Sequence, residues 1–488
     1  MLQLTTNFKF LLLPIISVFI FFSTEGFSQS KKNKKKPNII YIMADDLGYG
    51  DLSSYGQQKF NTPNIDALAA NGIKFTQHYS GSAVCAPSRS SLMTGQHTGH
   101  TFVRGNKEAG NDKKGQIPLP DNALTIAEML QQAGYKTGMF GKWGLGFGTG
   151  DPNNQGFDEF YGYNDQKLAH RYYPPYLNHN QEIDFLVGNN WINTQTYAQD
   201  KIQDATLNFI EENKDKPFFA YVPFVLPHAE LISPKDSILA KYTGKFKEVP
   251  FTAEDKYSSD YGPDIVKYKY CTQDTPYAVF ASMVDRMDVY VGQIVAKVKE
   301  LGLEEDTIIM FTSDNGPHDA GGANPEFFNS AAGFRGIKRD LYEGGIRAPF
   351  IVSWPNKIKK GTVTNHISAF WDVMPTLAEV AAVPKPNTTD GISFLPTLLA
   401  KKKQKQHPYL YWEFNIKNGR KAVRKGDWKA VVYNVNKNGE TELYNLASDP
   451  SESKNVASKY PKIVAEMQQI MKVAHTNSSV FPINQNRL

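Results

Sequence analysis

Residues 38–46, Asn-Ile-Ile-Tyr-Ile-Met-Ala-Asp-Asp, carry the pattern on which the fold assignment rests. A short, nearly continuous apolar run is typical of a strand buried on both faces, as in a parallel sheet. Residues 307–316, Thr-Ile-Ile-Met-Phe-Thr-Ser-Asp-Asn-Gly, repeat the arrangement, with acidic and amide side chains directly after the apolar run. We therefore expect two buried strands whose carboxyl ends bring these polar side chains together.

Outward from these two segments, apolar runs alternate with helical patterns. Two more strands are expected at 218–225 and 349–353. Helices are expected at 65–69, 121–130, 276–301 and 369–380, the second capped by Asp121 and stopped at Gly134. Alternation of this kind predicts an α/β fold with a large, mostly parallel sheet flanked by helices.

The pattern changes after the basic, polar segment 401–405. Beyond it lie short alternating segments (YLYWEF, KAVVYN and TELYNL) and a helical pattern at 460–473. This favours a small C-terminal antiparallel sheet with one helix. We expect a catalytic domain at 37–400 and a C-terminal subdomain at 406–488.

The N-terminus resembles a secretory signal peptide over residues 1–28, with an apolar run at 10–22 and a small-residue site at 26–28. The run is shorter than the ~20 residues needed to span a bilayer, so no stable membrane insertion is expected. An uncleaved anchor is the alternative. A basic spacer at 29–36 holds five lysines, which equal the formal net charge of +5, and no nucleic-acid module or partner is indicated. A periplasmic or secreted location follows.

The aspartates after the two apolar runs predict a metal site. Ligands of open α/β sheets bind outside the carboxyl ends of the strands. Asp45, Asp46, Asp314 and Asn315 would meet there as an all-oxygen site for a hard divalent cation. Without a cation the carboxylates would repel one another. The alternative is that each aspartate only caps the helix or turn after its strand.

Cys85 begins the segment Cys-Ala-Pro-Ser-Arg-Ser-Ser-Leu-Met-Thr-Gly, residues 85–95. Pro87 suits the first turn of a helix and Gly95 its end, which places Cys85 where free N–H groups favour an anion. Arg89 lies one turn further on. A thiol in this position is expected to have a lowered pKa. This chemistry leaves three options open for Cys85: a reactive thiolate, half of a disulfide with Cys271, or a buried structural cysteine.

The same segment resembles the maturation signature of type I sulfatases, members of the alkaline-phosphatase-like superfamily. Other motifs of that family follow in order: Asp45-Asp46, Gly141-Lys142-Trp143, Pro227-His228, Ser313-Asp314-Asn315-Gly316, Gly336-Ile337-Lys338, 342–347, 442–446 and Asp449-Pro450. The resemblance extends from about Lys36 to the terminal helix. It is closest in kind to bacterial carbohydrate sulfatases related to arylsulfatase A and galactosamine-6-sulfatase.

The resemblance implies roles for particular residues. Cys85 would be converted by a maturase to formylglycine (3-oxoalanine), whose hydrated aldehyde is the nucleophile. One Ca²⁺ per chain would be held by Asp45, Asp46, Asp314, Asn315 and an oxygen of modified Cys85. Arg89 would orient the hydrate, and Lys142, His228 and Lys338 would hold the sulfate oxygens. His228 or Lys338 would protonate the departing alcohol.

One position departs from the family pattern. Gly144 stands where the family commonly has the histidine of Gly-Lys-Trp-His-Leu-Gly, which is thought to take the proton that lets sulfate leave the enzyme. The base for that step is therefore unassigned, and His97, His100 and His318 are candidates by proximity to motifs.

Two loop-like stretches, 98–106 and 169–176, are candidates for reading the substrate. His100, Arg104 and His170 suit sugar hydroxyls or a second acidic group, although ordinary packing is the alternative for the aromatic residues. The leading hypothesis is a sulfuric ester hydrolase acting on a sulfated saccharide or polysaccharide. The alternatives are a formylglycine-dependent phosphate or phosphonate ester hydrolase and a glycan-binding relative that does not turn over.

Overall fold

The computed structural model describes residues 1–7, 9, 36–109, 115–253, 260–265 and 269–483. By its contacts the chain divides into two units, Met1–Lys35 and Lys36–Leu488. The helices and strands belong to the second unit, and the expected signal peptide and spacer lie largely outside the described residues. Within the described part of the chain, no helix combines the length and apolar character that a membrane crossing requires.

An 11-stranded sheet forms the centre of the second unit, in the order β10-β2-β9-β8-β1-β7-β3-β4-β5-β6, with β11 paired to β2. β1 (Asn38–Ala44) runs parallel to both β7 (Phe218–Pro223) and β8 (Thr307–Ser313). The others are β2 (Ile73–Tyr79), β3 (Lys136–Lys142), β4 (Glu159–Tyr163), β5 (Tyr176–His179), β6 (Glu182–Phe185), β9 (Arg347–Ser353), β10 (Thr362–Thr364) and β11 (Ser368–Ala369). The mostly parallel sheet is confirmed, although β9 pairs antiparallel to both β2 and β8.

Helices cover both faces of this sheet, as successive side chains of β1 show. Ile40 and Ile42 pack in a core with α1 (Pro63–Ala70), α4 (Ala198–Glu212) and α6 (Pro276–Glu300). Ile39 and Tyr41 pack in a second core. That core includes α2 (Cys85–Thr94), α3 (Ile126–Gln132), α9 (Val373–Val380) and α10 (Leu395–Leu398). Period-two alternation thus buries β1 on both faces, as its sequence predicts.

The helix expected from Asp121 begins later. Thr125 caps α3 and forms a capping box with Glu128, so the Asp121 assignment is wrong. The remaining helices are short turns: α5 (Ser237–Ala240), α7 (Pro325–Phe328) and α8 (Glu343–Ile346). α8 nevertheless contacts the end of β8, because Gly345 O accepts the N–H of Gly316 at 3.0 Å.

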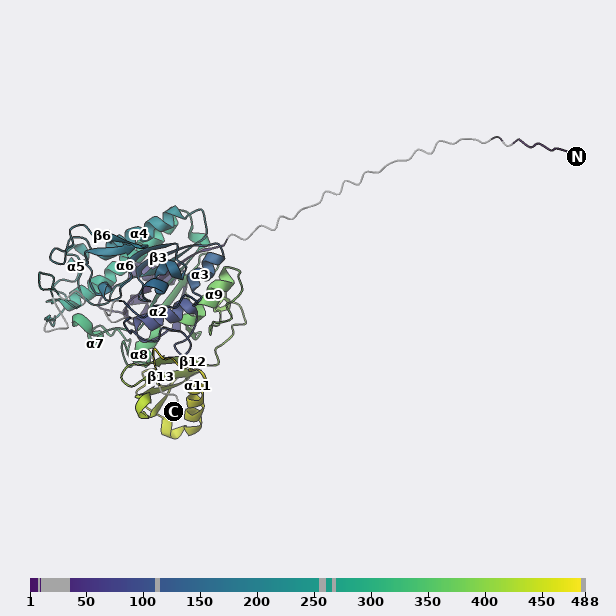
Figure 1. Ribbon diagram of the computed structural model, residues 1–488. Helices are drawn as coiled ribbons and strands as arrows, with labels where there is room; N and C mark the ends of the chain where they lie inside the picture. The colour runs from purple at the N-terminus through teal and green to yellow at the C-terminus, as the bar shows by residue number, and fades with distance from the viewer. Residues whose placement is uncertain (8, 10–35, 110–114, 254–259, 266–268, 484–488) are drawn as a thin grey trace. The chain divides into compact units, whose positions relative to one another are not determined.

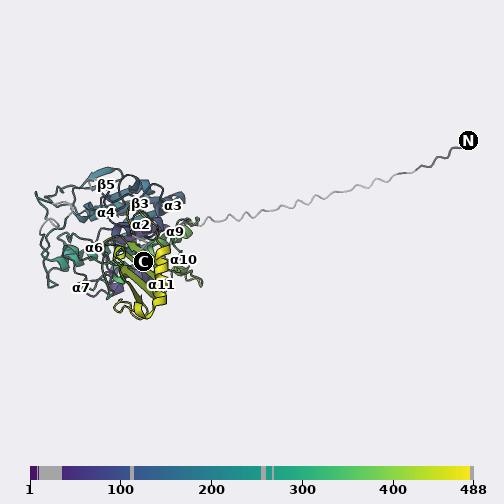
Figure 2. The ribbon, with the colours of Figure 1, turned by 60° about the horizontal axis from the view of Figure 1, so that its bottom comes forward.

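The C-terminal residues form a second, antiparallel sheet in the order β12-β13-β14-β15, with α11 (Pro461–Val473) against it. Its strands are β12 (Leu410–Phe414), β13 (Arg420–Lys425), β14 (Trp428–Tyr433) and β15 (Thr441–Asn445). One face packs on α11. The other face packs on the part of the chain that holds the 11-stranded sheet, through a core that includes Trp412 and Trp371. Figure 1 shows this layer in yellow and green at one end, and Figure 2 turns it toward the viewer.

Candidate active site

The carboxyl ends of β1 and β8 bring three aspartates and an asparagine together. β1 and β8 are paired in register up to Ala44 and Ser313, so the residues that follow are neighbours. Asp46 N–H donates to Asp314 Oδ1 at 3.1 Å, and Asn315 Nδ2 donates to Asp46 Oδ1 at 2.7 Å. All of these side chains are buried. The polar cluster expected at this sheet edge is present.

Cys85 is the first residue of α2 and faces this cluster. Its Sγ donates to Asp45 Oδ1 at 3.2 Å and lies 3.5 Å from Lys142 Nζ and 3.7 Å from Lys338 Nζ. Burial, followed by the charge of Asp45, raises the pKa of the thiol well above its ordinary value. The expected lowering of this pKa is therefore wrong, because burial and a carboxylate outweigh the helix terminus. Both cysteines are free and buried, which excludes the disulfide.

Arg89 and two lysines neutralise the carboxylates. Arg89 donates to Asp314 Oδ2 through Nη2 at 2.9 Å and Nε at 3.2 Å. Lys142 Nζ pairs with Asp45 Oδ2, and Lys338 Nζ lies 2.6 Å from Asp46 Oδ2. Burial opposes ionisation of these lysines, but Asp45 and Asp46, respectively, leave the pKa of each above its ordinary value. Both lysines are therefore cationic at neutral pH.

His228 completes the ring of residues. Its Nε2 lies 3.4 Å from Asp46 Oδ2, and its Nδ1 contacts the carbonyl oxygen of Ala229. Burial, and then the charge of Lys338, lower its pKa well below the ordinary value. A carbonyl only accepts hydrogen bonds, so the neutral ring carries its proton on Nδ1. Nε2 then presents a lone pair to the site.

The donor set fits a divalent cation. Asp45, Asp46, Cys85 and His228 each offer one ligand atom, and these atoms lie within 4.8 Å of one another. Asn315 Oδ1 is buried and accepts no hydrogen bond from the described residues. A buried acceptor without a donor is costly unless something positive meets it. The site can thus hold a metal, and its oxygens are the ligands that Ca²⁺ prefers.

Gly144 has Gln166 beside it. Its φ of +80° is in the left-handed region, and a Cβ added there would lie 2.7 Å from Gln166 Oε1. That oxygen is buried and has no hydrogen-bond partner within the described part of the chain. The glutamine side chain therefore occupies the space that a larger residue at 144 would enter.

The three histidines considered in place of residue 144 differ in position. His97 and His100 contact Asp390, with His100 Nδ1 2.8 Å from Oδ1. His318 lies beside the site, with its ring centroid 5.6 Å from that of His228. Its Nε2 contacts Pro227 O at 3.2 Å, and its Nδ1 accepts the Ala320 N–H at 3.1 Å.

A pocket of about 180 Å³ opens from the cluster. His170 is one of its walls and stacks on His228 with ring centroids 4.9 Å apart. The other lining residues are Val84, Asn106, Glu108, Gln116, Gln166, Lys167, His228, Tyr270, Lys338 and Arg339. Sequence reasoning missed Gln166, Tyr270 and Arg339, although the position of Arg339 directly after Lys338 was a usable signal.

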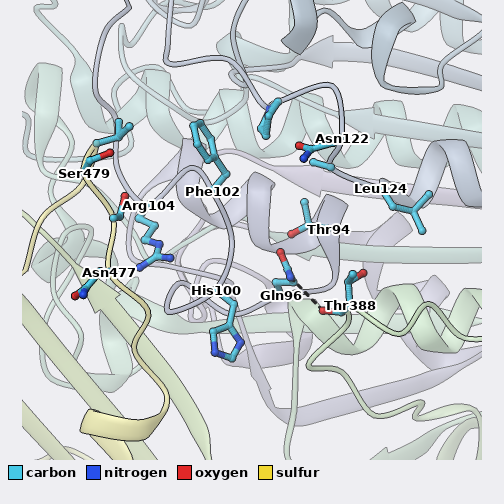
Figure 3. Close-up of a pocket in the computed structure, with 14 residues that line it drawn as sticks. Thr94, Gln96, His100, Phe102, Arg104, Asn122, Leu124, Thr388, Asn477 and Ser479 are labelled. Atoms are coloured by element: carbon cyan, nitrogen blue, oxygen red, sulfur yellow. Dashed lines mark hydrogen bonds between the residues drawn. The ribbon is translucent and has the colours of Figure 1, made fainter.

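His100 and Arg104 line a different pocket, of about 370 Å³, at the other end of α2 (Figure 3). Phe102, Asn122 and Ser479 are among its walls. Arg104 is buried there, with Nη1 2.9 Å from Glu413 Oε1. The structure thus brings His170 to the pocket beside His228 and Lys338 and places His100 and Arg104 away from it.

Comparison with known proteins identifies the family. The family described as Sulfatase matches residues 37–383, and the one described as N-sulphoglucosamine sulphohydrolase, C-terminal, matches residues 335–477. An N-acetylgalactosamine-6-O-sulfatase of Bacteroides thetaiotaomicron is 30% identical, over 95% of this chain and 98% of its own. Human arylsulfatase A is 30% identical, over 89% and 87%. The solved structure of Ps i-CgsB with k-i-k-neocarrahexaose has a TM-score of 0.73 at 27% identity, covering 90% and 92%. The chain belongs to the sulfatase family and is a sulfuric ester hydrolase.

Proposed function

We propose that the protein removes sulfate from a sulfated saccharide, using a formylglycine made from Cys85 and one bound Ca²⁺. The observation that carries this proposal is the setting of Cys85. It lies at a helix N-terminus with two lysine ammonium groups within 3.7 Å, yet burial and then Asp45 raise the pKa of its thiol. An unmodified thiol there is a poor nucleophile, whereas a hydrated aldehyde supplies a hydroxyl that attacks sulfur.

The fixed cations match the charge that develops on the sulfate. Lys142 Nζ and Lys338 Nζ lie 3.5 and 3.7 Å from Cys85 Sγ, so a sulfate bonded to that residue would lie within reach of both ammonium groups. Arg89, held by Asp314, fixes the orientation of the attacking group. Preorganised cations in a buried site stabilise the negative charge that appears as the S–O bond breaks.

Lys338 and His228 are suited to opposite proton transfers. Lys338 is cationic and carries a proton that it can donate to the departing alcohol oxygen. His228 is neutral with Nδ1 committed to Ala229 O, so its Nε2 is suited to accept a proton. We therefore assign protonation of the leaving group to Lys338 rather than to His228.

The proposed calcium ligands are Asp45, Asp46, Asp314, Asn315 and an oxygen of modified Cys85. This set is supported by the crowded carboxylates and by Asn315 Oδ1, which accepts no hydrogen bond from the residues that the structure describes. Bound there, Ca²⁺ would polarise a sulfate oxygen as a Lewis acid. The residues themselves hold their places through the Asp46–Asp314 and Asn315–Asp46 hydrogen bonds.

A saccharide substrate is proposed from the relatives and from His170. One relative is named for N-acetylgalactosamine 6-sulfate, and one solved structure holds a neocarrahexaose. His170, stacked on His228, adds a flat aromatic ring to the pocket wall, a surface on which a sugar ring can pack. A signal peptide, a periplasmic or secreted location and a formylglycine-generating maturase complete the proposal.

The test is the mass of the peptide that contains Cys85, from protein made in a host with a maturase. An aldehyde mass, together with sulfate release from sulfated oligosaccharides, is the expected result. Cys85→Ala should abolish release, and Cys271→Ala, which removes the other buried thiol, should retain it. An unmodified thiol in fully active protein would refute the formylglycine proposal.

A further inference from the structure

Arg339 adds a cation at the mouth of the catalytic pocket. It directly follows Lys338, lines the same pocket and is exposed, whereas Lys338 is buried. The two residues therefore present one positive charge inside the site and a second one at its entrance.

The backbone at Arg339 is held in an uncommon conformation. Its φ is +80°, in the left-handed region that costs a non-glycine residue about 1–2 kcal/mol. Its N–H donates to Ala83 O at 2.8 Å, and its carbonyl accepts from Arg420. Such conformations persist where the surroundings fix them, and they are enriched at ligand sites. The direction in which the Arg339 side chain leaves the main chain is thus determined by the fold.

The other charges around the pocket are balanced. Lys338 pairs with Asp46, and Lys167 Nζ lies 2.8 Å from Glu108 Oε1. The adjacent carboxylate, Asp340, forms an ion pair with Arg420, in which Nη1 lies 2.9 Å from Oδ1. Within residues 36–109, 115–253, 260–265 and 269–483, no carboxylate forms an ion pair with Arg339.

We infer that Arg339 forms an anion subsite that binds a second acidic group of the substrate, on the sugar next to the one that carries the scissile sulfate. This inference rests on the proposed saccharide sulfatase function and narrows it to polyanionic glycans. A guanidinium binds a carboxylate or a sulfate through two parallel N–H groups, so both groups share the chemistry.

The inference is tested by binding rather than turnover. Cys85→Ala protein is titrated by calorimetry with three oligosaccharides that share one sulfated N-acetylgalactosamine. The three ligands differ in the sugar next to this sulfated residue, which is a glucuronate in the first, a second sulfated sugar in the second and an uncharged sugar in the third. Arg339→Met in the same background should weaken binding of the acidic ligands about 10- to 100-fold, the range for a hydrogen bond to a charged group. Binding of the uncharged-neighbour ligand should change less than about twofold.

Two variants sharpen the result. Arg339→Lys should restore part of the affinity, because the charge returns without the planar fork. Arg335→Met is the matched control, since Arg335 is an exposed cation on the same loop that contacts Tyr444 instead of the pocket. If Arg339→Met lowers the affinity for only one of the two acidic oligosaccharides, the acidic group of that ligand is the one that the subsite binds.

Three outcomes would overturn the subsite. Arg339→Met could lower the affinity for all three ligands equally, it could leave all three affinities unchanged, or the Cys85→Ala parent could bind none of the ligands. A lack of sulfate release by formylglycine-bearing protein would instead overturn the proposed function, so the two failures are distinguishable.

Discussion

Replacement of Lys429 by methionine should destabilise the protein strongly, because this lysine is the centre of a buried ion cluster. Lys429 Nζ lies 2.9 Å from Glu343 Oε1 and 2.9 Å from Glu452 Oε1, and all three side chains are fully buried. Glu343 belongs to α8 of the main unit and Lys429 to β14 of the C-terminal sheet. Methionine has a similar length but removes the cation that faces Glu452, whereas Glu343 keeps Arg347 Nη1 at 3.2 Å. Breaking a buried pair in this way costs about 3–5 kcal/mol.

The destabilisation should depend on pH. Burial raises the pKa of Glu452 to about 7 even beside Lys429, whereas Lys429, against the effect of burial, lowers that of Glu343 to about 2. Without the lysine, the folded protein would take up a proton on the carboxyl pair. A carboxyl with a raised folded pKa contributes stability at low pH and loses it as pH rises. The unfolded chains titrate alike, so the deficit follows the folded pKa values. The pKa of Glu452, about 7 beside Lys429, rises further without it, so the deficit of Lys429→Met should grow above pH ~7 by about 1.4 kcal/mol per pH unit for one proton.

The assay is urea unfolding followed by circular dichroism at pH 5 and pH 8, with calcium held constant. Lys425→Met, on β13 of the same sheet, is the control, because its pair with Glu466 is exposed and worth at most about 1 kcal/mol. A deficit below about 1 kcal/mol at pH 8, or one equal at both pH values, would refute the reasoning.

Three further predictions concern the site. Asp46→Asn should abolish the stabilisation that calcium gives, about 2.7 kcal/mol at 100 times its Kd, as measured by thermal unfolding with and without chelator; an unchanged calcium response would contradict the proposed ligand set. Gly144→Ala should cost about 1–2 kcal/mol for its φ of +80°, with little added by the approach to Gln166 Oε1, the movable end of a side chain; recovery of the loss by Gln166→Ala in urea unfolding would contradict this. Lys338→Gln should slow hydrolysis of alkyl sulfates much more than that of 4-nitrophenyl sulfate, whose leaving group needs no proton, whereas an equal loss of kcat/KM would assign protonation elsewhere.

The central strands and the acidic strand ends are predictable from sequence, for a local reason. β1 and β8 are buried on both faces, so an apolar run forms the middle of each strand, and the acidic residues follow directly after the strand. The helix at Cys85 is equally local, because Gly95 ends it with φ +66°. In these segments the neighbours along the chain determine the structure.

The remaining features depend on residues far apart in sequence. β13 escaped prediction because Arg420-Lys421-Ala422-Val423-Arg424-Lys425 appears solvent-exposed, yet Lys421 and Arg424 are buried between layers. The thiol pKa of Cys85 follows from burial and from Asp45, 40 residues away, rather than from its helix. The Gln166 side chain near Gly144 likewise reflects packing of separate loops, which no local pattern reveals.

The charge balance of the site explains why a sulfate ester suits it better than a phosphate monoester. Three carboxylates face Arg89, Lys142 and Lys338, so their formal charges cancel. The proposed Ca²⁺ would leave two positive charges. A sulfate monoester carries one negative charge, which shifts toward the leaving oxygen as the S–O bond breaks. The attacking hydroxyl, as it gives its proton to a base, brings the second negative charge, so the two meet at the reacting sulfur only in the transition state. A phosphate monoester carries nearly two negative charges at neutral pH before it reacts. The same site would already match the charge of the phosphate monoester in the ground state. Less of the binding energy would then be specific to the transition state and lower the barrier.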